Sequence, residues 1–498
     1  MKDSSSDIFE IDLTTPVHAH FIGIGGVSMS GLAMILRDAG FTVSGSDRKA
    51  SDITDRMEKL GIKVAYQQVA ENINDDIDVV IYNAAIHPDN PEYAECVRRG
   101  LPMLDRAELV GQLMKNYKTA VAVAGTHGKT TTTSLVSHLF LAADTDPTIS
   151  VGGILPAIGG NIRIGKSDNF ITEACEYTNS FLKFAPTIGI ILNIEEDHMD
   201  FFHDLDEIRD SFRRFAALLP EDGTLIINAA IDNYSEITAD TKAKVITYGL
   251  PGFDSEGAAE DNGVKIKGAD EDRSDAGTFI YEKTPNYTAC DITFDESGCA
   301  TFSVIKNGEK KPGSFTLRVP GMHNVSNALS VIALSDAMGF GDDTMRKAME
   351  GFTGADRRFQ YKGKLNGFTI IDDFAHHPTE IKTTLDSAEK YPHRELWVVF
   401  QPHTYSRTKT FLNEFADVLG KADHVILVDI YAAREPDPGD ISSKDIVSLL
   451  QKNDKDAIYA GTFENAEKII LKNLQENDLL ITMGAGNVVE IGDNLLAR

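Results

Sequence analysis

The chain has 498 residues, enough for about three domains, and its composition is that of a globular protein, with 42% hydrophobic and 25% charged residues. The formal net charge of −28 argues against a nucleic-acid partner or an anionic membrane surface. The four cysteines lack zinc-finger spacing, and no segment has the apolar length of a signal peptide or membrane span. We therefore expect a cytoplasmic protein, as a monomer or a dimer.

The first block of the chain has the pattern of a nucleotide-binding fold. Strands are predicted at 17–23, 41–47 and 78–82, with helices between them, which favours a parallel sheet. The turn Gly23-Ile24-Gly25-Gly26 follows the first strand, and Asp47 ends the second. In dinucleotide folds such a turn approaches a diphosphate and such an acid accepts a ribose hydroxyl. Because Ser28 replaces the last glycine of that fingerprint, NAD, another diphosphate nucleotide and a simple tight turn all remain open.

The second block opens with a phosphate-loop motif. A buried strand is predicted at 119–124 and a helix at 134–140, and between them lies Gly125-Thr126-His127-Gly128-Lys129-Thr130-Thr131-Thr132. Backbone N–H groups of a glycine loop and a helix N-terminus bind phosphate, Lys129 adds a positive charge, and the Thr130 hydroxyl suits Mg²⁺. The loop is shorter than the common P-loop, whose first glycine would fall at Val123. The motif predicts an ATP site; the alternative is a glycine turn before a helix.

Two further residues are expected at the same sheet edge. Glu173 ends a strand predicted at 169–173, and His198 follows one predicted at 187–192. Ligands of open α/β sheets bind beyond the carboxyl ends of the strands, so both residues should lie near Lys129. A carboxylate and an imidazole there can hold Mg²⁺ with Thr130. The alternative is a helix-capping acid and a surface histidine.

The rest of the second block has a different character. A strand is predicted at 224–228, residues 250–314 predict antiparallel hairpins and loops, and a helix is predicted from Asn324 to Met338. Asn324 and Asn327 either contact an adenine or cap this helix.

The third block again predicts a doubly wound sheet, with strands at 368–372, 396–400, 424–428 and 478–482. A polar cluster from Asp372 to Glu380 follows the first of these strands, and it holds more Asp and His than a helix cap at Pro378 requires. Gln401 to Arg407 follow the second strand, where Arg407 can clamp a carboxylate.

With these residues assembled, the chain resembles the ATP-dependent Mur ligases over almost its whole length. The runs that carry the resemblance are 23–31, 90–92, 125–132, 172–176, 193–200, 321–329, 357–359, 372–380, 401–407 and 484–486. The His-His-Pro-Thr-Glu run at 376–380 and the Gln-Pro-His run at 401–403 favour the members of the family that add alanine.

The resemblance implies an α/β fold of three domains: an N-terminal Rossmann-like UDP-substrate domain (1–117), a central P-loop-type ATPase domain with a mixed sheet (118–354) and a C-terminal Rossmann-like amino-acid domain (355–498). It implies that ATP phosphorylates the lactyl carboxylate of UDP-N-acetylmuramate and that L-alanine attacks the acyl phosphate, in peptidoglycan precursor synthesis. A related activity, which attaches a recycled peptide to the same sugar nucleotide, is the alternative.

The resemblance also implies roles for individual residues. The catalytic residues would be Lys129, His198, His376 and Arg407. ATP would be bound by Gly125, Thr126, His127, Gly128, Lys129, Thr130, Thr131, Asn324, Arg358 and Asp373. The UDP substrate would be bound by Gly23, Gly25, Gly26, Ser28, Asp47 and His403. The Mg²⁺ ligands would be Thr130, Glu173 and His198.

Some residues and alternatives stay outside this assignment. Gln67, Gln68 and Asn83 depart from the family pattern in the first domain, so the exact uridine and diphosphate contacts are left open. The resemblance assigns no role to the acidic stretch 250–300. Two other classes remain open from the motifs alone. One is a nicotinamide-dependent dehydrogenase based on Gly23 to Asp47, and the other is a nucleotide switch without turnover.

Overall fold

The computed structural model describes residues 9–199, 201–254, 279–433 and 435–498. The chain divides into two compact units, Met1–Tyr248 with Ser330–Thr344, and Gly249–Leu329 with Met345–Arg498. Helices α8 (Met322–Ala337) and α9 (Asp342–Gly351) have residues in both units. Within the described ranges, no helix has the length and apolar character needed to cross a membrane.

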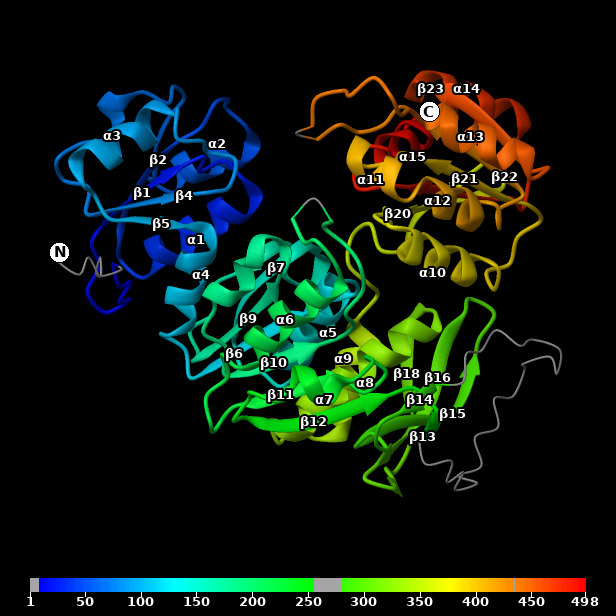
Figure 1. Cartoon of the computed structure of the whole chain (residues 1–498), viewed down its shortest axis with the longest axis horizontal. Helices are drawn as coiled ribbons and strands as arrows, with labels where there is room; N and C mark the ends of the chain where they lie inside the picture. The colour runs from blue at the N-terminus through cyan, green and yellow to red at the C-terminus, as the bar shows by residue number, and fades with distance from the viewer. Residues whose placement is uncertain (1–8, 200, 255–278, 434) are drawn as a thin grey trace. The chain divides into compact units, whose positions relative to one another are not determined.

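The first part of unit 1 is a parallel sheet with helices between its strands (Figure 1). Its elements are β1 (His18–Ile22), α1 (Val27–Asp38), β2 (Thr42–Ser46), α2 (Asp52–Lys59), β3 (Lys63–Ala65), η1 (Ala70–Asn72), β4 (Val79–Tyr82), α3 (Pro91–Arg99), β5 (Met103–Asp105) and α4 (Arg106–Met114). The strand order is β3-β2-β1-β4-β5, and every neighbouring pair is parallel. The three predicted strands are confirmed as β1, β2 and β4. The order reverses between β1 and β4, so a ligand is expected beyond their carboxyl ends.

The second part of unit 1 is a mixed sheet. Its elements are β6 (Thr119–Ala124), α5 (Lys129–Ala142), β7 (Thr148–Leu155), η2 (Pro156–Ile158), β8 (Gly160–Arg163), β9 (Asn169–Ala174), η3 (Tyr177–Lys183), β10 (Ile188–Ile191), α6 (Leu205–Ala216), β11 (Thr224–Asn228), α7 (Tyr234–Ile237) and β12 (Lys244–Gly249). The strand order is β12-β11-β10-β6-β9-β7-β8. The strands run parallel except β8, which is antiparallel to β7. β6, β9 and β10 are therefore neighbours, so their carboxyl ends bring the predicted ATP-site residues to one edge.

Unit 2 begins with hairpins. Its first strands are β13 (Gly252–Asp254), β14 (Phe279–Tyr281), β15 (Tyr287–Phe294), β16 (Cys299–Lys306), β17 (Glu309–Lys310) and β18 (Phe315–Pro320). β16 pairs antiparallel with β15, β17 and β18, which confirms the hairpins predicted in that part. β13 and β14 differ from the prediction, because they pair in parallel. Residues 255–278 of the acidic stretch lie outside the described residues. The helix predicted from Asn324 is confirmed as α8.

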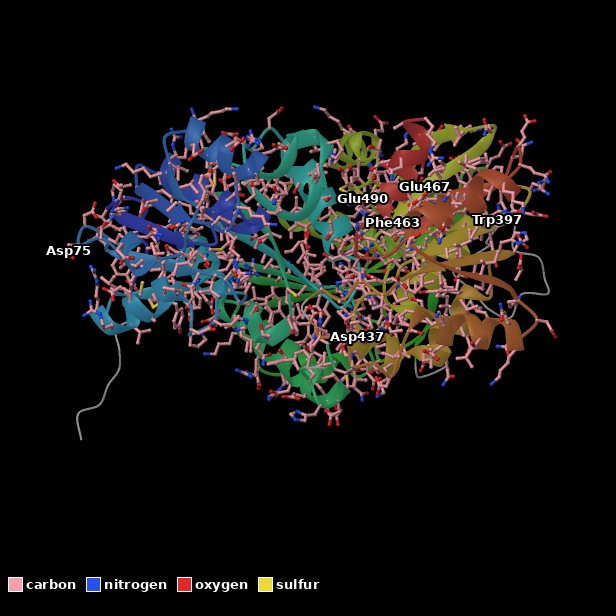
Figure 2. All side chains as sticks on the ribbon, turned by 90° about the horizontal axis from the view of Figure 1, so that it is seen from above. Asp75, Trp397, Asp437, Phe463, Glu467 and Glu490 are labelled. Atoms are coloured by element: carbon pink, nitrogen blue, oxygen red, sulfur yellow. The ribbon has the colours of Figure 1, made fainter. Side chains whose placement is uncertain are left out.

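The rest of unit 2 is a second doubly wound sheet. Its elements are β19 (Gln360–Leu365), β20 (Phe368–Asp373), α10 (Pro378–Ala388), β21 (Leu396–Phe400), α11 (Tyr405–Thr410), α12 (Leu412–Leu419), β22 (His424–Val428), α13 (Ser443–Lys452), β23 (Asp456–Gly461), α14 (Phe463–Asn473), β24 (Leu479–Met483) and α15 (Val489–Leu496). The strand order is β19-β20-β24-β21-β22-β23, with only β19 antiparallel to its neighbour. Apolar side chains fill both faces, with Trp397 (labelled in Figure 2) in one of the two clusters.

The α/β fold is confirmed. The predicted domain boundaries, between 117 and 118 and between 354 and 355, remain predictions.

Candidate functional site

The phosphate loop after β6 is joined to the loop after β10 by hydrogen bonds. The backbone N–H of His127 donates to Asn193 Oδ1 at 2.8 Å, and Asn193 Nδ2 donates back to the His127 carbonyl at 3.1 Å. Gly128, at φ 81°, precedes α5 in a left-handed conformation that favours glycine. Helix α5 begins at Lys129, earlier than predicted, so Lys129, Thr130 and Thr131 form its first turn. Backbone N–H groups of such a turn lack partners within the helix and suit phosphate oxygens.

The ammonium of Lys129 is folded back onto its own loop. Its Nζ donates to the carbonyl oxygens of Gly125 at 2.5 Å and Thr126 at 3.0 Å. It also pairs with Glu176, whose two carboxylate oxygens accept at 3.1 and 3.3 Å. Burial is the largest single influence and lowers the pKa of Lys129, but the charge and hydrogen bond of Glu176, together with the nearby Cys175 and Glu173, raise that pKa above its ordinary value. Lys129 is therefore a permanent cation at the loop.

His198 lies close to the same carboxylate. Its Nε2 is 3.9 Å from Glu176 Oε1 and 3.7 Å from Asp197 Oδ2. The backbone of His198 is left-handed, at φ 55°, a strained conformation for a residue with a side chain. Its ring packs on Tyr177 with the centroids 4.5 Å apart. Lys129 and His198 thus both lie near the carboxylate of Glu176. The sequence predicted no role for Glu176.

The predicted metal ligands are in part engaged elsewhere. Glu173 Oε1 accepts a hydrogen bond from the backbone N–H of Gly152 at 2.6 Å. Hydroxyl and carboxylate oxygens are the ligands that Mg²⁺ prefers, so the donor types of Thr130, Glu173 and Glu176 fit this ion. Among the residues that the structure describes, no group of three His, Cys, Asp or Glu side chains is placed to hold a metal. The assignment of Thr130, Glu173 and His198 as ligands remains a prediction.

The glycine turn of the first sheet is held by Asp47. The backbone N–H of Gly25 donates to Asp47 Oδ2 at 2.8 Å, and Asp47 Oδ1 accepts from the N–H of Arg48 at 2.7 Å. A Cβ on Gly25 would lie 2.8 Å from Asp47 Oδ2, so a larger residue there would force Asp47 or the turn to move. Ser28, in α1, accepts a hydrogen bond of 3.4 Å from Arg106. The carboxylate expected to bind a ribose therefore also shapes the turn.

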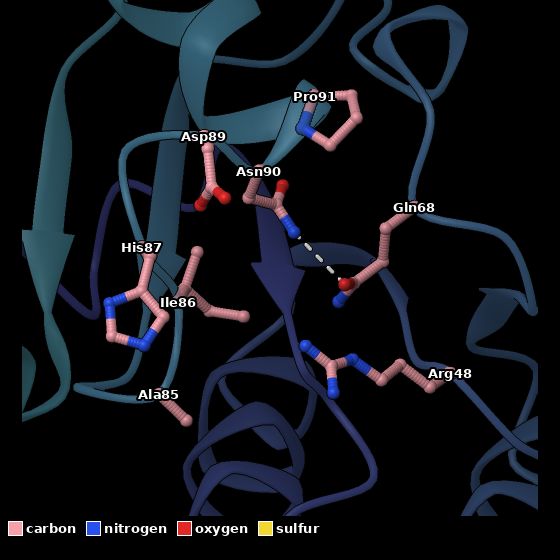
Figure 3. Close-up of a pocket in the computed structure, with 8 residues that line it drawn as sticks. All are labelled: Arg48, Gln68, Ala85, Ile86, His87, Asp89, Asn90 and Pro91. Atoms are coloured by element: carbon pink, nitrogen blue, oxygen red, sulfur yellow. Dashed lines mark hydrogen bonds between the residues drawn. The ribbon is translucent and has the colours of Figure 1, made fainter.

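A pocket of about 230 Å³ lies at the carboxyl edge of this sheet (Figure 3). Arg48 follows β2, and 85–91 follow β4, the two strands on either side of β1. Asn90 Nδ2 donates to Gln68 Oε1 across the pocket at 2.9 Å. Arg48 and His87 offer donors for an anionic ligand. The pocket is lined by Arg48, Gln68, Ala85, Ile86, His87, Asp89, Asn90 and Pro91. The sequence pattern singled out Gln68, which departs from the family, and the run 90–92, which resembles it, but it predicted no binding role for any lining residue.

Glu92 supports the walls of this pocket from inside the fold. It is fully buried. Its Oε2 accepts from Ser46 Oγ and its Oε1 accepts from Asn72 Nδ2, both at 2.5 Å. Because Ser46 ends β2 and Asn72 ends η1, one carboxylate joins the segments that precede Arg48 and follow Gln68.

In unit 2, Asp373 and Arg358 are brought together. Asp373 is 6% exposed and its two oxygens accept from the backbone N–H groups of Ala375 at 2.7 Å and Phe359 at 2.8 Å. Burial raises the pKa of Asp373 to about 6, although the charge of Arg358 lowers it. The Arg358 guanidinium lies over the ring of Phe374, 5.5 Å from its centroid. The role of this pair in ATP binding remains a prediction.

The predicted histidines and arginine of unit 2 also gather. The rings of His376 and His403 are 5.6 Å apart, and Arg407 Nη1 lies 3.2 Å from His403 Nδ1. His376 Nδ1 lies 3.1 Å from Glu380 Oε2, and Glu380 also lies 3.6 Å from Arg358. These residues follow different strands, β20 and β21, and meet because both strands end at one edge.

Two asparagines at the start of α8 have partners of their own. Asn324 Nδ2 donates to the Pro320 carbonyl at 2.7 Å, and Asn327 Nδ2 donates to Asn324 Oδ1 at 3.2 Å. Both residues lie inside α8 (Met322–Ala337), and neither bond accepts from a backbone N–H as a helix cap does. The capping alternative and a contact of Asn324 with adenine both remain predictions. At α10, Pro378 is the first helical residue and Glu380 lies in the first turn, which confirms the capping predicted there.

Three sequence profiles match this chain in the order of its sheets. The profile of the Mur ligase family, catalytic domain, matches residues 18–118. The Mur ligase middle domain matches residues 123–335, and the Mur ligase, glutamate ligase domain matches residues 357–486. Together they cover most of the chain.

Curated proteins and solved structures agree with these matches. The chain is 54% identical over 491 residues, 99% of its length and 100% of the other protein, to a UDP-N-acetylmuramate–L-alanine ligase of Agathobacter rectalis. It is 52% identical over 489 residues, 98% of its length and 100% of the other protein, to the enzyme of that name from Lachnospira eligens. The crystal structure of the UDP-N-acetylmuramate-alanine ligase of Thermotoga maritima matches with a TM-score of 0.75 and 28% identity, covering 97% of this chain and 98% of that one.

Proposed function

The chain belongs to the Mur ligase family, and from this premise we propose that it joins L-alanine to the lactyl carboxylate of UDP-N-acetylmuramate at the expense of ATP. The product is an amide, formed as a step of peptidoglycan precursor synthesis. Relatives that share the full length of the chain carry this name, and that supports the choice of substrates. We place the reaction in the cytoplasm, because the four cysteines are all free, as a reducing compartment requires.

The observation that carries the proposal is the position of Lys129. Its charged ammonium lies at the N-terminus of α5, inside a glycine loop, with Glu176 and His198 beside it. A carboxylate substrate is already a nucleophile, so phosphoryl transfer to it depends on alignment and charge neutralisation more than on a base. The loop N–H groups and Lys129 supply both alignment and charge neutralisation to the β- and γ-phosphates. A carboxylate oxygen bonds to the phosphorus, and ADP leaves.

We propose Thr130, Glu173 and His198 as the residues that hold Mg²⁺. The ion would neutralise charge on the phosphate oxygens during the transfer. Removal of divalent ions with EDTA should abolish turnover, and added Mg²⁺ should restore it.

The second half of the reaction needs a neutral amine and a group that takes its proton. The nitrogen of L-alanine attacks the acyl carbon, phosphate leaves, and one N–H proton is lost. We propose His376, whose imidazole lies beside Glu380, as the proton acceptor. Arg407, 3.2 Å from His403, would bind the alanine carboxylate as a fixed cation.

For the UDP substrate, we propose the glycine turn and the pocket in Figure 3. The turn residues Gly23, Gly25 and Gly26 and the cation of Arg48 would face the diphosphate. This pocket adds Arg48 and His87 to the predicted set.

The proposal is tested by measuring ADP release with each substrate omitted in turn. We expect release only when ATP, UDP-N-acetylmuramate and L-alanine are all present. Equal release without the sugar nucleotide would refute a ligase of this class. A preference for a tripeptide over L-alanine would instead identify the peptide-attaching alternative, and NADH binding would favour a dehydrogenase.

A further inference from the structure

Glu176 has no role in the reaction proposed above, yet it forms an ion pair with Lys129, the cation of the phosphate loop. Its carboxylate is only 2% exposed, and the Lys129 side chain is 16% exposed. Buried charges of this kind are stable only as pairs. The free enzyme therefore holds Lys129 with an internal anion at the place where the proposed ATP phosphates would bind.

The hydrogen-bond capacity of Lys129 is already filled. An ammonium has three N–H donors, and its contacts are the carbonyl oxygens of Gly125 and Thr126 and the two oxygens of Glu176. A phosphate oxygen that binds Lys129 must displace one of these acceptors. The carbonyls belong to a backbone that is tied to Asn193, whereas the carboxylate sits at the end of a side chain that can rotate. Glu176 is thus the partner that gives way.

A second partner for the displaced carboxylate lies nearby. His198 Nε2 is 3.9 Å from Glu176 Oε1, within a small side-chain movement of hydrogen-bond distance. The residues after Glu176 are also conformationally strained, since Thr178 and Asn179 both have left-handed backbones, at φ 55° and 57°. The two residues form a kink inside η3, close to Glu176 in the chain.

We propose that Glu176 is a competing counterion: it holds Lys129 in the empty loop and must release it before a phosphate can bind. The inference rests on the proposed ATP site and adds a positioning residue to it. The proposal predicts the direction in which nucleotide affinity changes when the carboxylate is removed. Because part of the binding free energy is spent on separating Lys129 from Glu176, removal of the carboxylate strengthens the binding of nucleotide phosphates.

The test is the affinity for ADP of Glu176→Gln, measured calorimetrically in EDTA so that no divalent ion takes part. Glutamine keeps the shape of the side chain and removes its charge. We expect binding to be tighter by about fivefold or more. The control is Glu236→Gln, which removes one negative charge from α7, where Glu236 pairs with Arg209 at 3.3 Å on the surface. Its ADP affinity should equal that of the unmodified chain.

Equal or weaker ADP binding by Glu176→Gln in EDTA would overturn the inference. If Glu176 were a metal ligand instead, the substitution would weaken only binding measured with Mg²⁺, which also contradicts the proposal. If the unmodified chain bound no ADP even with Mg²⁺ present, the proposed ATP site itself would be refuted, so the two failures are distinguishable.

A stability measurement covers the case in which Glu176→Gln folds poorly. The single substitution leaves the buried ammonium without its anion, so the melting temperature of the empty enzyme should fall. In Lys129→Met/Glu176→Gln both charges are absent, and the double variant should melt above Glu176→Gln. A double variant that melts below both single variants would contradict the pairing. Glu176→Asp keeps the negative charge on a side chain that is one methylene shorter, so the carboxylate lies farther from Lys129. This variant should tighten ADP binding by a smaller factor than Glu176→Gln does.

Discussion

Arg357 donates from Nε to Asp372 Oδ2 at 2.8 Å. The two terminal nitrogens of the same guanidinium donate to the carbonyl oxygens of Gly486 at 2.8 Å and Gly484 at 2.7 Å. Asp372 is completely buried; burial raises its pKa, and the charge of Arg357 opposes that rise. One side chain therefore joins the end of β20 to the loop after β24, next to the segment that carries His376.

Arg357→Lys should weaken this connection, because an ammonium cannot reproduce three donors that point in fixed directions. We expect a loss of about 1–3 kcal/mol in unfolding free energy, because hydrogen bonds to buried acceptors are lost while the charge is kept, and a KM for L-alanine that rises more than kcat falls. The control is Arg394→Lys, which alters the pair of Arg394 with Asp478 at the opposite, amino-terminal edge of the sheet. It should leave the KM unchanged. A KM unaffected by Arg357→Lys would contradict this positioning role.

Gly25→Ala should damage the UDP-substrate site selectively. The new methyl group would lie 2.8 Å from Asp47 Oδ2 and 2.9 Å from Thr54 Cγ2, so the turn must shift. We expect the KM for UDP-N-acetylmuramate to rise at least about tenfold, a cost of about 1.4 kcal/mol, while the KM for ATP stays within about twofold. Gly341→Ala is the control, because nothing lies within 4 Å of its added methyl group. Equal changes in both KM values would indicate a general folding defect instead.

The buried Asp373 should make stability depend on pH. Its pKa is raised from 3.8 to about 6, so between these values the folded chain binds a proton more tightly than the unfolded chain. Stability from this group is therefore present at low pH and lost as pH rises towards 6, by about 3 kcal/mol in total. Asp373→Asn removes this loss. The melting temperature of the variant minus that of the unmodified chain should be larger at about pH 7 than at about pH 4.5. An equal difference at both pH values would contradict the assignment.

His376→Gln should separate substrate binding from proton transfer. Glutamine can donate and accept hydrogen bonds but cannot take up the amine proton, so kcat should fall by about 100-fold or more. The affinity for ADP should remain unchanged. His393→Gln is the control: His393 Nδ1 lies 2.6 Å from the carbonyl oxygen of Tyr391, and this variant is expected to behave like the unmodified chain. A full kcat in His376→Gln would remove this residue from the amide-forming step.

Local sequence predicted most of the regular structure. The apolar run at 119–124 became β6 with the same bounds, and Pro378 begins α10 as expected, because burial of a strand and the capping of a helix depend on adjacent residues. The helix after the phosphate loop was predicted five residues too late. Threonine is a weak helix former, and the run Thr130 to Thr133 is helical because Gly128 turns the chain directly into α5.

The sequence by itself determined that this chain carries a phosphate loop, three nucleotide-type sheet patterns and the residues of a Mur ligase, because each of these signals lies within one short segment. Only the tertiary structure decided which carboxylate faces Lys129. Glu173 and Glu176 are three residues apart and alike in chemistry, but Glu173 turns to Gly152 and Glu176 to Lys129. The same holds for Arg357 and Glu92, which join segments far apart in the chain. Such contacts depend on the path of the backbone after each strand, which no local pattern encodes.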